Sequence, residues 1–218
     1  MKLISVVVGT SSPLTVTQML WINLIMDTFA AMALASLPPD PSVLKDQPRS
    51  REAFIITKDM ARRILGVGLL FVVILFGFIQ YFMNFGIESM ADFSFHDYFA
   101  SYFKFDHLGG EFTPKELSLL FTIFVFMQFW NIFNAKAYHT NDSALKGLFH
   151  KDVRRGFGFT LLIILVGQIL IVSFGGEMFS VVPLPLGDWV RIIVGTSVIL
   201  WIGEVERWLK KLKFAKKK

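Results

Sequence analysis

Five long apolar runs alternate with short polar loops along this chain, and they constrain its fold more than any other feature. Four of them, residues 14–37, 64–83, 117–135 and 157–174, approach the ~20 residues that a helix needs to cross a bilayer core of roughly 30 Å. The fifth, residues 184–205, is interrupted by Asp188 and Arg191, but Trp189 and Trp201 at its flanks are typical of the aromatic belt at a membrane interface. The pattern predicts an all-α membrane protein, a bundle of about five transmembrane helices.

The composition supports the membrane class. Of the 218 residues, 54% are hydrophobic and only 18% are charged, which is too little polar surface for a soluble domain. The basic residues lie in loops and in the tail rather than on one soluble face, so the net charge of +5 does not predict nucleic-acid binding. The absence of cysteine excludes disulfides and thiolate metal sites.

The distribution of Lys and Arg predicts the topology. Both are frequent in the loops 38–63 and 136–156 and in the tail 206–218, which we therefore expect in the cytoplasm. The loop 84–116 has two lysines among many acids, and the loop 175–183 has no basic residue, so we expect both outside. Residues 1–13 would then hold the end of a preceding helix and an outer turn, and we expect the chain to be part of a longer one.

An acidic residue, Asp27, lies close to the midpoint of the first apolar run. An Asp at that depth costs about 2.5 to 3.5 kcal/mol on insertion scales, so its presence needs a reason. Asn23 lies four residues earlier, on the same helix face and one turn away. Their oxygens suit a hard cation such as calcium, magnesium or sodium, or proton carriage, and they predict a cation site. The alternative is that both form hydrogen bonds between helices.

A second polar set lies in the third run. Gln128 is near the midplane, level with Asp27, whereas Asn131 and Asn134 lie toward the cytoplasmic end. The Gln128 amide can give one oxygen to a cation or hydrogen-bond across helices, which makes it a possible secondary ligand. Gln168 in the fourth run has a weaker claim to such a role.

Three stretches carry a resemblance to a known family. "SSPLTVTQMLWINLIMDTFAAMALASLPPDP" resembles the sixth transmembrane helix and following loop of P-type calcium-transporting ATPases, most closely the plasma-membrane type and its bacterial relatives. "FMQFWNIFNAKAYHTNDSALKGLF" resembles the eighth helix of that family and the loop after it. "ILIVSFGGEMFSVVPLPLGDWVRIIVGTSVILWIGEVERWLK" is similar to its last two helices. The five runs would then be family helices six to ten.

The resemblance implies a role for the residues of "NLIMD". The Asn and Asp of this pattern are cation ligands in the family and correspond to Asn23 and Asp27. Pumps that hold two calcium ions have a hydroxyl residue just before the Asp and a Glu in the eighth helix, where this chain has Met26 and Gln128. The resemblance thus implies a single site for calcium as the transported ion, shared with a fourth-helix glutamate that this sequence does not contain.

The sequence lacks the phosphorylated aspartate motif, the nucleotide-binding and actuator domains and the first four helices of the family, and no Gly-rich phosphate loop replaces them. We therefore expect no ATP hydrolysis by this chain alone, with ATP and magnesium acting only through the amino-terminal part of the same pump. That part and the lipid bilayer are the expected partners, and the plasma membrane is the expected location. The expected function is the carboxyl-terminal transport segment of an ATP-driven calcium pump. The alternative is a structural or regulatory membrane subunit that docks on other helices and transports nothing.

Overall fold

The computed structural model describes residues 12–38, 54, 56–105, 110–138, 142–148 and 153–215. These residues form helices and connecting turns and contain no β-strand. Five helical stretches are long and apolar enough to cross a membrane: Val16–Ala35, Lys58–Phe85, Pro114–Lys136, Gly156–Phe174 and Leu186–Leu212. This confirms the predicted all-α bundle of about five transmembrane helices. Most of the expected stub, residues 1–13, and most of the loop 38–63 lie outside the described residues.

The first span is a continuous helix with a wider turn in its middle. It consists of α2 (Val16–Leu20), the π-helix η1 (Trp21–Met26) and α3 (Asp27–Ala35). Thr15 and Gln18 form a capping box at its start, in which the Thr15 hydroxyl accepts from the Gln18 N–H at 3.3 Å. The Gln18 side chain also donates to the Phe179 carbonyl at 2.8 Å, which fixes α2 against the short helix α9 (Gly176–Phe179).

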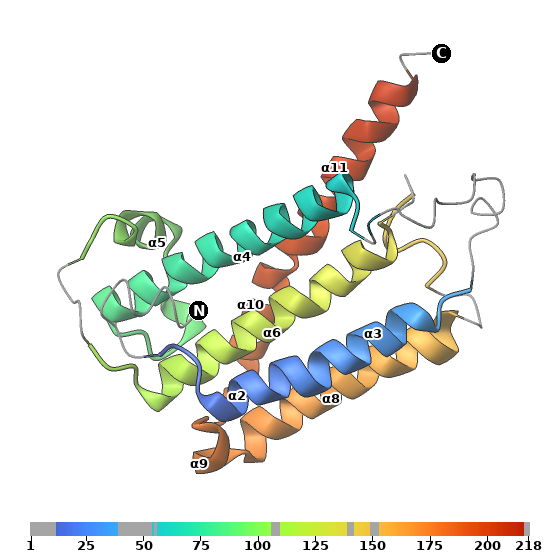
Figure 1. Cartoon of the computed structure of the whole chain (residues 1–218). Helices are drawn as coiled ribbons and strands as arrows, with labels where there is room; N and C mark the ends of the chain where they lie inside the picture. The colour runs from blue at the N-terminus through green and yellow to red at the C-terminus, as the bar shows by residue number, and fades with distance from the viewer. Residues whose placement is uncertain are drawn as a thin grey trace.

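The helix α8 (Phe159–Phe174) follows the π-helix η4 (Arg154–Gly158) and runs beside the first span over most of its length (Figure 1). Two glycines allow this close approach. A Cβ on Gly167 would lie 2.7 Å from the Trp21 ring, and a Cβ on Gly156 would overlap the Ser36 side chain. Small residues at helix contacts in membranes serve this purpose, because they let the backbones approach.

The helix α6 (Pro114–Lys136) is the centre of the bundle (Figure 1). It contacts α3, α4, α8, α10 and α11, and 67% of its most apolar window is buried, more than in any other span. Its start is encoded locally, because Thr113 caps the helix, Pro114 occupies the first turn and Glu116 completes a capping box. Buried apolar residues occur on all sides of α6 rather than on one stripe, as in a helix inside a bundle.

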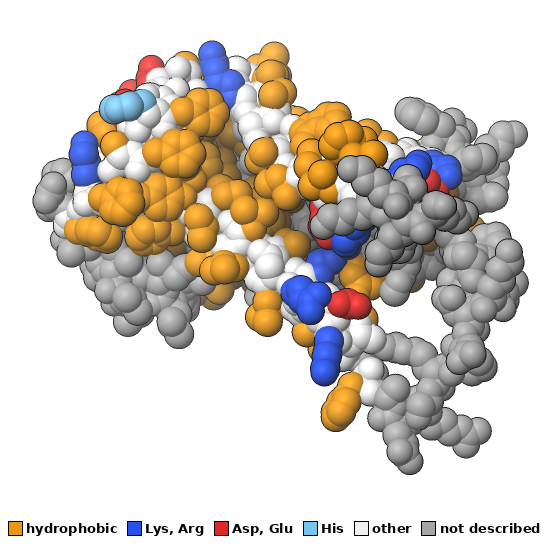
Figure 2. Space-filling view, turned by 90° about the horizontal axis from the view of Figure 1, so that it is seen from above, with side chains coloured by type: hydrophobic (Ala, Val, Ile, Leu, Met, Phe, Trp, Pro, Cys, Tyr) orange, Lys and Arg blue, Asp and Glu red, His pale blue; other side chains and the backbone are white. Residues whose placement is uncertain are grey.

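The helix α4 (Lys58–Phe85) carries a small subdomain at its carboxyl end, made by the 3-10 helix η3 (Met90–Asp92) and α5 (Phe95–Ser101). Tyr98 and Tyr102 lie over Gly77 of α4, and their hydroxyls donate to the carbonyls of Ile74 and Val73 at 2.9 and 2.8 Å. Hydrophobic side chains cover much of the face that Figure 2 shows from above. Such exposed apolar surface is expected where a helix faces lipid.

The last span differs from the single helix expected over residues 184–205. It consists of α10 (Leu186–Thr196) and α11 (Val198–Ala215), with a turn at Ser197. The Thr196 and Ser197 hydroxyls donate to the carbonyls of Ile192 and Val194, both at 2.6 Å, and such back-bonding bends helices. The residues expected as a tail from 206 onward are helical as far as Ala215.

Candidate cation site

Asn23 and Asp27 lie at the π-helical turn in the middle of the first span. Asn23 is inside η1, and Asp27 begins α3 with a backbone N–H that donates to the Ile22 carbonyl, five residues back. A π-helical turn inserted in an α-helix is rare and is frequent at functional sites. The two predicted ligands therefore occupy the one irregular turn of this span.

Both side chains are exposed in this chain, on one stripe of the helix. Exposed positions with helical spacing along the span are Val16, Leu20, Asn23, Asp27, Ala31 and Ala35, and Thr28 and Met32 are exposed beside them. The opposite side is buried and includes Gln18, Ile22 and Ala33. Only 20% of the apolar window of this span is buried, the lowest share of the five. The helix thus presents its oxygen ligands on a face that the described part of the chain does not cover.

The oxygen set of this face is incomplete for calcium. Asn23 can give one side-chain oxygen and Asp27 can give two, whereas calcium takes about 6 to 8 oxygen ligands. Among the described residues, no group of three or more His, Cys, Asp or Glu could complete a metal site. The remaining ligands of a calcium ion would have to come from other helices, main-chain carbonyls or water.

Gln128, the possible secondary ligand, lies on α6. It lines a cavity of about 430 Å³ between α4 and α6, together with Asn131 and Asn134. The described lining of this cavity includes no residue of η1 or α3. The structure therefore does not bring Gln128 into a shared cavity with Asp27.

Gln168 is placed between the helices of the bundle. Its side chain on α8 is 1% exposed, and neither amide atom has a hydrogen-bond partner among the described residues. The neighbouring residue, Gly167, packs against Trp21 of η1, whose indole nitrogen is also buried without a described partner. A polar side chain so placed is costly and is a site where water or a further group would be accommodated.

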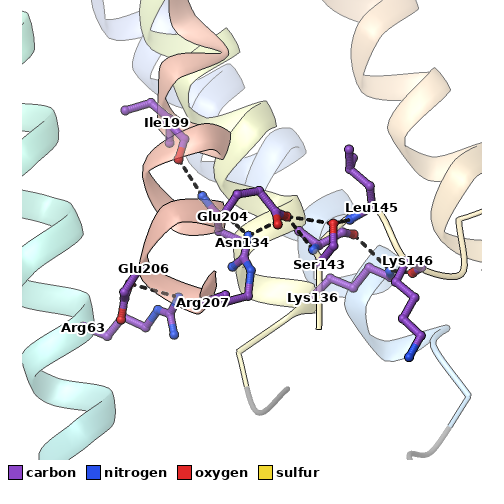
Figure 3. Close-up of polar contacts among 11 residues, drawn as sticks. Arg63, Asn134, Lys136, Ser143, Leu145, Lys146, Ile199, Glu204, Glu206 and Arg207 are labelled. Atoms are coloured by element: carbon purple, nitrogen blue, oxygen red, sulfur yellow. Dashed lines mark hydrogen bonds and ion pairs between the residues drawn. The ribbon is translucent and has the colours of Figure 1, made fainter. Parts of the chain in front are cut away.

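A polar cluster that the sequence did not predict joins α6 to α11 (Figure 3). We call Asn134, Glu204 and Arg207 the α6–α11 latch. The Asn134 amide donates to the Ile199 carbonyl at 2.8 Å and accepts from Arg207 Nη2 at 2.9 Å. Arg207 Nη2 also donates to Glu204 Oε1 at 2.9 Å. With 3% exposure, Arg207 is a buried cation in the segment expected to be a tail.

The latch also holds the turn at residues 142–148. Glu204 Oε1 accepts from the Ala144 N–H at 2.6 Å and from the Ser143 hydroxyl at 3.1 Å (Figure 3). Gly203 makes room for the latch, because a Cβ there would overlap the Asn134 amide. One signal for the latch was present in the sequence. Gly203, Glu204 and Arg207 lie at the end of an apolar run, so that a glycine and two opposite charges fall on adjacent helical turns.

A second buried carboxylate lies at the other end of the bundle. Asp188 of α10 is fully buried and accepts from the Ser89 hydroxyl at 2.7 Å and the Met90 N–H at 2.9 Å, with Lys115 Nζ at 3.8 Å. From the sequence, Asp188 was interpreted only as an interruption of an apolar run. In the structure it joins α10 to η3 through Oδ1, whereas its Oδ2 is buried without a hydrogen-bond partner among the described residues.

Comparison with known proteins assigns the chain to a family. The family model described as "Cation transporting ATPase, C-terminus" matches residues 11–209. Plasma membrane calcium-transporting ATPase 2 of Oreochromis mossambicus is 35% identical over 199 residues, which are 89% of this chain and 16% of that protein. Plasma membrane calcium-transporting ATPase 4 of Bos taurus is 33% identical over 201 residues, with 89% and 15% covered.

A more distant organism gives the same result. The calcium-transporting ATPase PAT1 of Dictyostelium discoideum is 32% identical over 195 residues, which are 88% of this chain and 16% of that protein. The chain therefore spans about 15% of the length of the curated relatives that it matches. Because the family model covers nearly the whole chain, and the fold is the expected membrane bundle, the chain belongs to the family of cation-transporting ATPase C-terminal regions.

Proposed function

We propose that this chain forms the carboxyl-terminal transport helices of an ATP-driven calcium pump, in which Asn23 and Asp27 are two ligands of the transported ion. The observation that carries the proposal is the exposed stripe of the first span. Both oxygen-bearing side chains lie on it, at a π-helical turn. A carboxylate at mid-span that faced lipid in the working protein would cost about 2.5 to 3.5 kcal/mol, so this face requires a polar partner.

The partner would be the amino-terminal part of the same pump. Ala31 and Ala35 continue the exposed stripe, and such small residues allow another helix to approach closely. A fourth-helix glutamate on that part would supply further oxygens to a single calcium ion. The relatives named above are calcium-transporting ATPases, which supports calcium over magnesium, manganese or sodium.

The proposed mechanism is alternating access. ATP and magnesium act on the amino-terminal domains, whose phosphorylation tilts helices against one another. Asp27 and Asn23 then bind calcium from the cytoplasm and release it on the other side. The loops rich in Lys and Arg and the end of α11 would face the cytoplasm of a plasma membrane.

The test joins this chain to the amino-terminal part of a calcium pump and measures calcium-dependent phosphorylation by ATP. We expect Asp27→Asn and Asn23→Ala each to abolish phosphorylation at calcium concentrations that saturate the unmodified protein, because each removes an oxygen ligand. Asp59→Asn is the matched control, since Asp59 is an exposed carboxylate at the start of α4 that pairs with Arg62. Unchanged calcium affinity in both variants would mean that the two side chains only hydrogen-bond between helices.

A further inference from the structure

The cavity between α4 and α6 changes character along its length. Arg63 and Tyr138 line it near the end of the bundle where α4 begins and α6 ends. Val67, Gly68 and Phe71 line it further along α4. From Arg63 to Phe71 the helix rises about 12 Å. The α4 side of the cavity is therefore cationic at the membrane boundary and apolar toward the middle of the span, where the amides of Gln128 and Asn131 line the α6 side.

The cationic group at the polar end has capacity for a ligand. Arg63 forms a long ion pair with Glu206 at 3.6 Å and lies over the Tyr138 ring at 5.3 Å, and among the described residues it donates no hydrogen bond. A guanidinium has five N–H donors, and it suits a phosphate group because two of them can bind two of its oxygens.

The surroundings of this end carry excess positive charge. Three ion-paired cations, Arg63, Arg207 and Lys210, share two carboxylates, Glu204 and Glu206, which leaves a formal charge of +1. Lys136 donates to the carbonyls of Ala144 and Lys146 and pairs with no acid in the described part of the chain. Arg207 is bonded to Asn134, a lining residue, and its Nε and Nη1 are buried without described partners. An anion at this end would balance the charge.

We propose that this cavity binds one phospholipid from the adjoining leaflet, with its phosphate on Arg63 and one acyl chain along Val67, Gly68 and Phe71. A free anion would use only the polar end, and an apolar compound would leave the Arg63 donors unused. A phospholipid places its phosphate on the Arg63 donors and an acyl chain on the apolar lining. Basic pockets between transmembrane helices bind lipid headgroups in this way. The net charge favours an anionic headgroup over a zwitterionic one.

Two glycines of α4 allow a matched test. A Cβ on Gly68 or on Gly66 would meet no atom within 4 Å, but only Gly68 lines the cavity. The chain is purified in detergent without calcium, and native mass spectrometry measures binding of dioleoylphosphatidylserine and dioleoylphosphatidylcholine. We expect one tightly bound phosphatidylserine and weaker phosphatidylcholine. Gly68→Phe should weaken phosphatidylserine binding about ten-fold or more by filling the cavity, and Gly66→Phe should leave it unchanged.

A second pair of variants tests the headgroup without filling the cavity. Arg63→Gln should weaken phosphatidylserine binding about ten-fold. Arg62→Gln should not, because Arg62 is exposed and outside the lining. The proposal would be overturned if the unmodified chain bound no lipid, or if Arg63→Gln and Arg62→Gln bound phosphatidylserine equally well. Both results can be obtained even if Gly68→Phe fails to fold. Since the assay contains no calcium, its outcome is independent of the proposed calcium site.

Discussion

Removing the Glu204 carboxylate should destabilise the bundle far more than removing Glu206, two residues later on the same helix. Glu204→Ala leaves Arg207, which is 3% exposed, without its counter-charge and takes an acceptor from the Ala144 N–H. Breaking a buried pair costs about 3 to 5 kcal/mol. Since Glu204 is 19% exposed and Asn134 still accepts from Arg207, we expect the lower end, about 3 kcal/mol.

Glu206→Ala is the matched control. Glu206 is 46% exposed and pairs with Lys210 at 2.6 Å and with Arg63 at 3.6 Å. Exposed ion pairs contribute about 0 to 1 kcal/mol, so this change should cost less than about 1 kcal/mol. Equilibrium unfolding of the chain in mixed micelles by added dodecyl sulfate, followed by circular dichroism, gives both free energies of unfolding.

A double variant separates the charge effect from lost packing. Glu204→Ala combined with Arg207→Met removes both charges and keeps an unbranched side chain in the buried position. Replacing a buried ion pair by apolar groups is often neutral, so the double variant should be more stable than Glu204→Ala alone. A Glu204→Ala loss no larger than that of Glu206→Ala, or a double variant less stable than the single one, would refute the reasoning.

Three further changes follow from individual contacts. Gln168→Met should raise the free energy of unfolding by about 1 kcal/mol, because it removes a buried amide without described partners. Gln80→Met should lower the free energy of unfolding, because the Gln80 amide donates to the Lys104 carbonyl. Unfolding by dodecyl sulfate measures both. Gly77→Leu should cost about 2 kcal/mol in the same assay, because two tyrosine hydroxyls occupy the space of the new side chain. The His96 ring, mainly by its hydrogen bond, holds the pKa of Asp97 below its usual value. Any stability that this carboxylate gives is therefore present above the usual pKa and lost as pH falls through the lowered one. Carboxyl NMR should show the pKa of Asp97 rising in His96→Gln, and an unchanged pKa would exclude this cause.

The apolar runs were sufficient to predict the number and type of the spans, because length and hydropathy decide whether a helix can cross a bilayer. Helix starts were also local: Thr113, Pro114 and Glu116 encode the beginning of α6 through hydrogen bonds between residues 113 and 116. The break at Ser197 was not predicted, since it depends on which carbonyls the hydroxyls of Thr196 and Ser197 reach. Such back-bonding leaves no trace in hydropathy.

The candidate site was predictable only in part. The spacing of Asn23 and Asp27 predicted a shared face, but not the π-helical turn that carries them. It also did not predict the exposure of that face, because this depends on which side of the span packs against α8. Arg207 was assigned to a tail because charge at the end of a span normally faces water. Its burial depends on Asn134, which is distant in sequence, and a single sequence does not reveal that pairing.

The spans differ in how much of each is buried, from 67% of the apolar window of α6 to 20% of that of the first span. α6 is tied to α11 and to the turn 142–148 by the latch, and Arg63 connects α4 to the same end of α11. In the described part of the chain the first span forms no ion pair, its Gln18 donates to the Phe179 carbonyl, and the buried share of its apolar window is the smallest of the five. A helix with few buried contacts can shift at lower free-energy cost than one at the centre of the core. The span that carries Asn23 and Asp27 thus has the smallest buried share of the five. This suits the proposed role, because a helix that carried ion ligands would have to shift for their access to change during transport.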